Sequence, residues 1–264
     1  MMNFSAKKSL GQNFLNDQKI INLIAEIGNV NCKDIVLEVG PGTGNLTEKI
    51  LEKKPRDFIL IEKDQRLADY LIKKFGDKIK IFNEDMLKFS YENYYKKNLI
   101  IFGNLPYNIS TQILAKWIKI KELDKFCKKL VLMFQKEVAD RIIAKNNTKN
   151  YGRLSILSNW KLDVEKIIDI EPDCFKPAPK VKSTLLVFTP KKKFFELNDP
   201  KNLEHVTNIF FSQRRKMIKK PLKFLFKDFQ DIAGILNLNL SLRPQNLNNV
   251  TYYKISKLYE SLTD

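Results

Sequence analysis

The sequence predicts an α/β fold with a doubly wound parallel sheet, followed by a small helical domain. Apolar runs of strand length recur through the first part of the chain with helix-like segments between them. This is the βαβ pattern of a parallel sheet that is covered on both faces. After Pro190 the residue pattern changes, and a lysine-rich connector is followed by short amphipathic segments. We therefore expect a larger domain over residues 1–190 and a helical domain over residues 191–264.

Four apolar runs are predicted to form the first strands of the sheet. They span residues 35–39, 58–61, 78–82 and 98–102. Near-continuous apolar character is typical of parallel strands that are buried on both faces. Helical periodicity between these strands predicts helices over residues 46–53 and 65–75.

Later elements follow from the same patterns. Two further apolar runs predict strands at residues 129–134 and 183–188, and residues 136–144 are predicted to be helical. Prolines cannot occupy a helix interior, so the cluster Pro172, Pro177 and Pro179 marks a loop. Beyond residue 190, the predicted helices are separated by Pro200, Pro221 and Pro244.

Composition narrows the classes of partner. The chain of 264 residues has a formal net charge of +17, which favours a polyanion such as a nucleic acid. A merely lysine-rich solvated surface is the alternative. No apolar stretch approaches the roughly 20 residues of a membrane span, so no membrane partner is expected.

The cysteines and the single histidine give little sign of metal or disulfide chemistry. Cys32, Cys127 and Cys174 are scattered and odd in number, so we expect no disulfide framework and no Cys-x-x-Cys metal site. This usage predicts a reducing cytoplasm. The lone His205 lies in the C-terminal segment and is expected to be structural or solvated.

A glycine-rich turn, Gly40-Pro41-Gly42-Thr43-Gly44, follows the strand at residues 35–39. Glycines allow the backbone to turn sharply and to approach a ligand closely. The spacing G-x-G-x-G differs from the G-x-G-x-x-G of dinucleotide binders, so we expect this turn to hold an amino-acid carboxylate or a sulfonium centre. A structural turn for tight packing of the strand on the helix explains the glycines equally well.

Two acidic residues favour the ligand-binding interpretation of this turn. Glu62 directly follows the strand at residues 58–61, and Asp85 follows the next strand. Ligands bind at the carboxyl ends of strands in open α/β sheets. There Glu62 can accept from both ribose hydroxyls, and Asp85 from an adenine amino group. Taken singly, each could be a solvated loop acid, but together they predict S-adenosylmethionine as a methyl donor.

The tetrapeptide Asn104-Leu105-Pro106-Tyr107 closes the strand at residues 98–102 and predicts the acceptor site. The Asn104 side-chain oxygen and the Leu105 carbonyl can accept from an exocyclic amine, while Pro106 fixes φ and Tyr107 stacks on the ring. A base inside a duplex cannot reach such a site, so the target must be unpaired or flipped out. Phe175 is our candidate for a second stacking face; alternatively it is a loop aromatic that caps the core. The sequence thus predicts methylation of an adenine amino group in a nucleic acid.

Seven segments together give a family resemblance. They are residues 7–15 (KKSLGQNFL), 38–47 (EVGPGTGNLT), 103–110 (GNLPYNIS), 135–141 (QKEVADR), 151–155 (YGRLS), 175–183 (FKPAPKVKS) and 211–216 (FSQRRK). In these segments the chain resembles the KsgA family, the small-subunit ribosomal RNA adenine dimethyltransferases, over nearly its whole length. The combination is highly specific, whereas any one segment alone is not.

This resemblance implies a Rossmann-like S-adenosylmethionine-dependent methyltransferase with a small C-terminal α-helical domain. It implies that two adjacent adenines in the 3′-terminal hairpin loop of 16S ribosomal RNA become N6,N6-dimethyladenine, with a role in small-subunit biogenesis and no metal. The partner is 16S ribosomal RNA within the small subunit or its precursor, and we expect a monomer. The implied contacts to the methyl donor come from Asn13, Leu15, Gly40, Glu62, Asp85 and Asn104. Where the family usually has glycine, this chain has Glu84, which we expect to point away from the donor.

Two alternatives compete with this interpretation. The first is a 23S ribosomal RNA adenine dimethyltransferase of the macrolide-resistance type, which shares the fold and a similar acceptor motif. Leu105 and residues 213–216 favour the small-subunit family. The second is a non-catalytic assembly factor that keeps the fold. The intact glycine turn, the acids at the strand ends and the acceptor motif argue against a loss of catalysis.

The C-terminal part of the chain carries a cluster of basic residues. We predict RNA-binding roles for Arg214, Arg215, Lys216, Lys219, Lys220 and Lys223. Helical spacing would align most of them on one side, where they would contact the phosphate backbone. The alternative is a solvated helix face in a lysine-rich protein.

Overall fold

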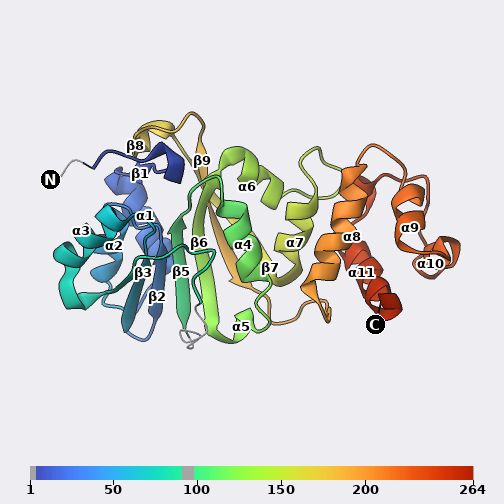
Figure 1. The fold of residues 1–264 in the computed structure, drawn as a ribbon, viewed down its shortest axis with the longest axis horizontal. Helices are drawn as coiled ribbons and strands as arrows, with labels where there is room; N and C mark the ends of the chain where they lie inside the picture. The colour runs from blue at the N-terminus through green and yellow to red at the C-terminus, as the bar shows by residue number, and fades with distance from the viewer. Residues whose placement is uncertain (1–3, 91–97, 264) are drawn as a thin grey trace. The chain divides into compact units, whose positions relative to one another are not determined.

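The computed structural model describes residues 4–90 and 98–263 (Figure 1). Its main sheet has seven strands in the order β4-β3-β2-β5-β6-β9-β7, and a second sheet pairs β1 with β8. The strands are β1 (Phe14–Leu15), β2 (Ile35–Val39), β3 (Asp57–Ile61), β4 (Lys80–Phe82), β5 (Leu99–Asn104), β6 (Cys127–Gln135), β7 (Leu162–Ile170), β8 (Phe175–Lys176) and β9 (Ser183–Pro190).

Helices alternate with these strands in the first part of the chain and follow them in the last. They are α1 (Gln18–Gly28), α2 (Asn45–Leu51), α3 (Gln65–Phe75), α4 (Ser110–Ile118), α5 (Leu123–Phe126), α6 (Lys136–Ile142), α7 (Arg153–Lys161), α8 (Pro200–Ser212), α9 (Lys219–Leu225), α10 (Phe229–Ile235) and α11 (Asn249–Thr263). Among the described residues, no helix is both long enough and apolar enough to span a membrane.

The strands β4, β3, β2, β5 and β6 are parallel, as the sequence predicts, and β2 lies at the centre of this group. The next strand, β9, runs antiparallel to β6, with Leu132 opposite Leu186. A parallel strand needs a crossover connection, usually a helix. The segment between the neighbouring strands β7 and β9 contains no α-helix, only a short 3₁₀ turn and the two residues of β8, so it lacks the helical crossover of a parallel pair. The sheet is therefore mixed at one side.

The core forms because the central strands are buried on both faces. All five residues of β2 are buried. Val36 belongs to a single apolar cluster with Phe102 of β5 and with Ile21 and Ile24 of α1. The packing between α1 and the sheet is so close that a side chain at Gly28 would meet the Phe102 ring at 2.3 Å. This packing fixes the carboxyl ends of β2, β3 and β5 relative to one another.

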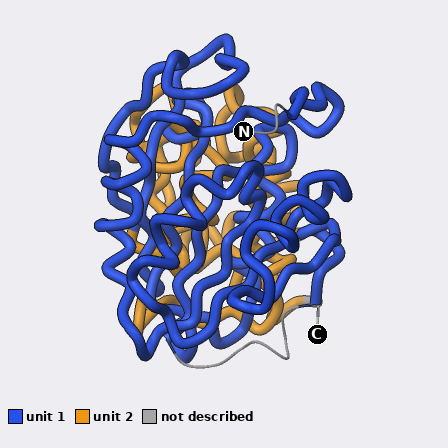
Figure 2. The backbone as a smooth tube through the Cα atoms, turned by 90° about the vertical axis from the view of Figure 1, so that its left-hand side faces the viewer, with its two compact units in different colours: residues 1–139, 164–190 blue, residues 140–163, 191–264 orange. Residues whose placement is uncertain are grey.

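The chain forms two compact units, shown in different colours in Figure 2. The first contains residues 1–139 and 164–190, and the second contains residues 140–163 and 191–264. One boundary between the units falls at residue 190, and residues 140–163 belong to the second unit because they pack with the C-terminal segment. Trp160 donates to the Phe195 carbonyl (2.7 Å), and Tyr253 donates to the Ile156 carbonyl (3.0 Å). The chain passes from one unit to the other within α6 and again within β7. No change in composition marks these two boundaries.

Candidate active site

One cavity lies at the carboxyl ends of β2, β3 and β5, in the first unit. Its lining includes nearly all the residues that the sequence suggests for donor and acceptor binding. These are Asn13, Leu15, Gly40, Gly42, Glu62, Asp85, Asn104, Leu105, Pro106 and Tyr107. Parallel pairing explains the convergence, because Val39 at the end of β2 is in register with Ile61 of β3 and Gly103 of β5.

The glycine turn after β2 depends on left-handed backbone. Gly40 has φ 68° and Gly42 has φ 59°. A Cβ at Gly42 would lie 2.8 Å from Cδ1 of Phe14, so a side chain there would also collide with the aromatic ring above the turn. A Cβ at Gly40 would lie 3.5 Å from the Asn104 carbonyl oxygen. The turn therefore lies directly against the acceptor strand.

Glu62 is buried at 6% exposure, and both of its carboxylate oxygens are held by backbone amides. The N–H of Asp64 donates to Oε1 at 2.8 Å, and the N–H of Gly42 donates to Oε2 at 3.2 Å. Burial raises the pKa of Glu62 above its usual value. A carboxylate has about four lone-pair sites, so Glu62 can still accept from a hydroxyl group of a ligand.

A second carboxyl group, Glu38, lines the same cavity and was not assigned a role from the sequence. It is 2% exposed, and Thr47 Oγ1 donates to its Oε2 at 2.7 Å. Burial raises the pKa of Glu38 to about 8. Glu38 therefore keeps its proton at neutral pH, and Thr47 fixes its orientation beside the glycine turn. The sequence offers one sign of its place in the cavity, which is that Glu38 lies two residues before Gly40 of the glycine turn.

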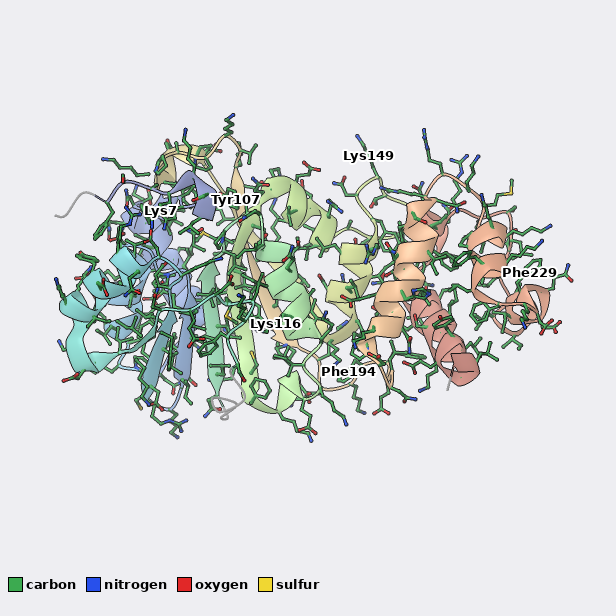
Figure 3. The ribbon with its side chains drawn as sticks, in the orientation of Figure 1. Lys7, Tyr107, Lys116, Lys149, Phe194 and Phe229 are labelled. Carbon is green, nitrogen blue, oxygen red and sulfur yellow. The ribbon has the colours of Figure 1, made fainter. Side chains whose placement is uncertain are left out.

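The turn after β4 carries Asp85 and is held by two lysines. Lys63 donates to Asp85 Oδ2 at 2.8 Å, and this hydrogen bond holds the pKa of Asp85 below its usual value. Lys116 of α4 (labelled in Figure 3) donates to three carbonyl oxygens of the turn. These belong to Met86 (3.1 Å), Leu87 (3.0 Å) and Phe89 (2.8 Å). Sequence spacing gives no sign of this anchor, because it joins segments about 30 residues apart.

Glu84 also contributes to the lining of the cavity. The expectation that its side chain points away from the donor stays a prediction. The residue is exposed overall, so its carboxylate remains solvated while the residue borders the cavity next to Asp85.

The acceptor motif presents two carbonyl groups to the cavity. The Asn104 amide nitrogen donates to the Asn13 carbonyl oxygen at 2.8 Å. Since a carbonyl oxygen can only accept, this bond orients the amide and leaves the Asn104 side-chain oxygen available. Among the described residues, neither this oxygen nor the Leu105 carbonyl oxygen is used by a protein donor. Tyr107 (Figure 3) is fixed by a 2.7 Å hydrogen bond between its hydroxyl and Ser183 Oγ.

The N-terminal segment over residues 7–13 is bonded to the donor side of the cavity. Lys7 Nζ lies 3.0 Å from Asp64 Oδ1, and Gln12 Nε2 donates to Asp64 Oδ2 at 3.0 Å. Arg66, followed by Gln12 and Lys7, holds the pKa of Asp64 well below its usual range. The same Asp64 supplies the backbone amide that orients Glu62, so the segment and the carboxylate share one anchor.

Phe175 does not line the cavity. It is 4% exposed and belongs to the apolar core cluster, together with Leu15, its partner in the β1–β8 pairing. Successive residues of a strand point to opposite faces, and here Lys176 takes the exposed face. The stacking face that the sequence suggests at Phe175 is thus replaced by a core contact.

The C-terminal basic residues do not share one side of a helix. Helix α8 ends at Ser212 and α9 begins at Lys219, so the intervening residues form turns. Arg214 donates to Gln245 Oε1 (3.3 Å) and to the carbonyl oxygens of Thr148 (3.4 Å) and Lys149. Its role in the structure is to join loops of the second unit. Five other basic residues are exposed: Arg215, Lys216, Lys219, Lys220 and Lys223.

The remaining candidates for chemistry lie outside the cavity. His205 is exposed in α8, and its ring centroid lies 5.3 Å from that of Tyr259, which agrees with a structural role. In the described part of the chain, no cluster of three or more His, Cys, Asp or Glu side chains is arranged to hold a metal ion.

The fold and the cavity place this chain among the Rossmann-like methyltransferases. A model of the family described as ribosomal RNA adenine dimethylase matches residues 3–263. The chain belongs to this family and is an enzyme, as the sequence motifs predict. Ribosomal RNA small subunit methyltransferase A of Pelagibacter ubique (strain HTCC1062) is 55% identical over 257 residues, covering 97% of this chain and 98% of the relative. The protein of that name from Ehrlichia ruminantium (strain Gardel) is 41% identical, covering 92% of each.

Solved structures agree with this assignment. A dimethyladenosine transferase from Plasmodium falciparum is 26% identical with a TM-score of 0.77, covering 92% of this chain and 95% of that chain. The 23S rRNA methyltransferase ErmE is 23% identical with a TM-score of 0.68, covering 96% and 100%. The second likeness establishes only the shared fold.

Proposed function

We propose that this enzyme transfers methyl groups from S-adenosylmethionine to the N6 amino groups of two adjacent adenines in the 3′-terminal hairpin loop of 16S ribosomal RNA. The product is N6,N6-dimethyladenine at both positions. The single observation that carries the proposal is the pair of available acceptors, Asn104 Oδ1 and the Leu105 carbonyl, at the end of β5. Two relatives, of 55% and 41% identity, are named ribosomal RNA small subunit methyltransferase A, and these names support small-subunit RNA as the substrate.

In this mechanism the chain's own groups make the amine reactive. An adenine amino nitrogen is a weak nucleophile because its lone pair is delocalised into the ring. Asn104 Oδ1 and the Leu105 carbonyl each accept from one amino N–H, which localises the lone pair and stabilises the positive charge that develops on nitrogen. Tyr107, held by Ser183, offers its face to the base. S-adenosylmethionine supplies an activated methyl group when bound.

The cavity fits this donor in its chemistry. The donor carries hydroxyl groups on its ribose, and Glu62 brings to the cavity a buried carboxyl group that the backbone amides of Asp64 and Gly42 orient. We assign donor contacts to Asn13, Leu15, Gly40, Gly42, Glu62, Asp85 and Asn104. In this assignment Glu62 accepts from the ribose hydroxyls and Asp85 from the adenine amino group. No metal is part of the proposal.

We further propose that the substrate is 16S ribosomal RNA within the small subunit or its precursor, that the enzyme acts as a cytoplasmic monomer, and that it takes part in subunit biogenesis. The exposed basic residues of the second unit, Arg215 to Lys223, are then RNA contacts. A 23S-specific enzyme is less favoured, because the relatives of 55% and 41% identity carry small-subunit names. Membership of the enzyme family argues against a non-catalytic factor, and the acceptor groups are intact.

Mass spectrometry of ribosomal RNA from a strain that lacks this protein tests the proposal. We expect both dimethyladenines to be missing from the 3′-terminal hairpin of 16S RNA and to return when the wild-type gene is supplied. Unchanged 16S modification, or a loss confined to 23S RNA, would reject it. Return of the modifications with an Asn104→Ala variant would reject the mechanism alone.

A further inference from the structure

A groove adjoins the cavity within the first unit. Its volume is about 1140 Å³, and its walls are formed by the N-terminal segment and by residues 176–181. Phe14 and Tyr107 line both the groove and the cavity, so the two spaces meet at these rings. Pockets for a single small ligand measure roughly 300–1,000 Å³. The groove therefore has room for more of a substrate than one base.

The groove is positively charged. Lys8, Lys176 and Lys180 are exposed, line the groove, and form no ion pair with an acid among the described residues. A fourth lysine, Lys74, is paired with Glu48 at 3.1 Å, and this glutamate is the one acid among the lining residues that the structure describes. The three remaining lysines thus leave an excess of positive charge along the walls.

The two walls are tied together where β1 pairs with β8, so Lys176 is carried by fixed backbone. Strands β1 and β8 pair with Phe14 opposite Lys176. The Cys174 carbonyl oxygen accepts from the N–H groups of Asn16 (2.9 Å) and Asp17 (3.3 Å). A ligand that contacts both walls meets a preformed surface, and little ordering of the chain opposes its binding.

We propose that this groove binds the unpaired ribonucleotides that flank the target adenine, with Lys8, Lys176 and Lys180 contacting their phosphates. The proposal rests on the proposed function and extends it to the path of the RNA strand. A single strand carries one phosphate per nucleotide, which matches lysines spaced along two walls. Its unstacked bases need apolar or aromatic surface, and Phe14 and Val181, which is 45% exposed, provide such surface in the groove.

The test compares two triple variants of the full chain. Lys8→Gln, Lys176→Gln and Lys180→Gln together remove the groove charges. The control removes the same charge with Lys33→Gln, Lys54→Gln and Lys78→Gln. These lysines lie just before β2, β3 and β4, at the amino ends of the strands, whereas the cavity lies at the carboxyl ends. Fluorescence anisotropy measures binding of a short unstructured adenosine-containing oligoribonucleotide between 50 and 200 mM salt. Calorimetry with S-adenosylmethionine confirms that each variant keeps its donor site.

For single strands, each phosphate contact contributes about 0.7 to the slope of log affinity against log salt. Loss of three contacts lowers the slope by about 2, so over this fourfold change in salt the wild type loses about 20-fold more affinity than the groove variant. The control triple should keep the wild-type slope. Equal slopes for the two triples, or a wild-type slope in the groove variant, would overturn the proposal.

These results also separate this proposal from the function on which it rests. If the wild type methylates 16S RNA but the groove lysines do not affect binding, the strand takes another path and the function stands. If the wild type methylates no RNA, the proposed function fails, whatever the oligonucleotide shows. Binding of the oligonucleotide that is insensitive to salt would point to contacts other than phosphates and would likewise reject the role of the lysines.

Discussion

The side-chain amide of Asn104 is oriented by the backbone carbonyl of Asn13, which it meets at 2.8 Å although the two residues are 91 positions apart. This bond fixes which end of the amide faces the cavity. The oxygen that the proposed chemistry needs is therefore presented by a contact outside the acceptor motif.

Replacing Asn104 tests the acceptor site. Asn104→Ala removes an acceptor whose hydrogen bond strengthens as charge develops, so we expect kcat to fall by about 10²–10³, the range for loss of one such stabilising group. Asn104→Asp should also be poor, because a carboxylate cannot donate to Asn13. Single-turnover methylation of small subunits measures the loss. Near-normal turnover by either variant would contradict the mechanism.

Replacing Glu62 tests the donor site. Glu62→Ala should weaken S-adenosylmethionine binding by about 1.5–3 kcal/mol, the scale of hydrogen bonds to a charged group. Calorimetry measures the affinity, and Glu52→Ala, at an exposed residue directly after α2, is the control. Unchanged donor affinity in a folded Glu62→Ala protein would remove this residue from the site.

Lys116→Met should weaken donor binding without touching the donor directly. It removes the charged donor that bonds the carbonyl oxygens of Met86, Leu87 and Phe89, so the turn that carries Asp85 loses its anchor. We expect about tenfold lower affinity, equivalent to about 1.4 kcal/mol. Faster amide hydrogen exchange at the turn should accompany the loss. Lys121→Met is the exposed control, and equal affinities for both variants would refute the anchoring role.

Glu38 predicts a pH dependence of stability. Burial raises its pKa from the usual 4.5 to about 8, so between these values the folded protein holds a proton that the unfolded chain releases. Its contribution to stability is full below the unfolded pKa and is lost as pH rises toward 8, with a slope of at most about 1.4 kcal/mol per pH unit. Urea unfolding at several pH values should show a shallower decline in Glu38→Gln. Parallel curves would contradict this.

Neutralising Arg215, Lys219 and Lys220 together should lower affinity for the small subunit and flatten its salt dependence, with donor binding intact. Arg214 is left unchanged because it bonds three groups of the second unit. Binding measured at several salt concentrations tests this. Wild-type slope and affinity would place RNA recognition in the first unit alone.

Regular periodicity made much of the fold predictable. Helix α3 and strand β2 have the predicted bounds, because each combines a clear apolar period with clear end signals. The glycine turn and the motif at Asn104 lie where the strand ends predict. Strand β7 was not predicted, because its polar residues interrupt the apolar run that marks the other strands. Helix α1 was not predicted either.

Other features depend on tertiary pairing that no local pattern records. Phe175 turns inward because β8 pairs with β1. The turn after Ser212 interrupts what spacing alone suggests as one basic helical face. Lys116 binds the turn after β4, and Asp64 binds the N-terminal segment, so each contact joins segments that are far apart in the sequence. Such contacts become visible only once the chain is folded.

The segment over residues 7–13 has a thermodynamic consequence, because it is bonded to Asp64 on the donor side and to Asn104 on the acceptor side. A displacement of this segment changes both sides together. If one ligand shifts this segment toward the position that the other ligand needs, the two affinities become linked. Linkage is reciprocal, so RNA must then strengthen donor binding by the same factor by which the donor strengthens RNA binding.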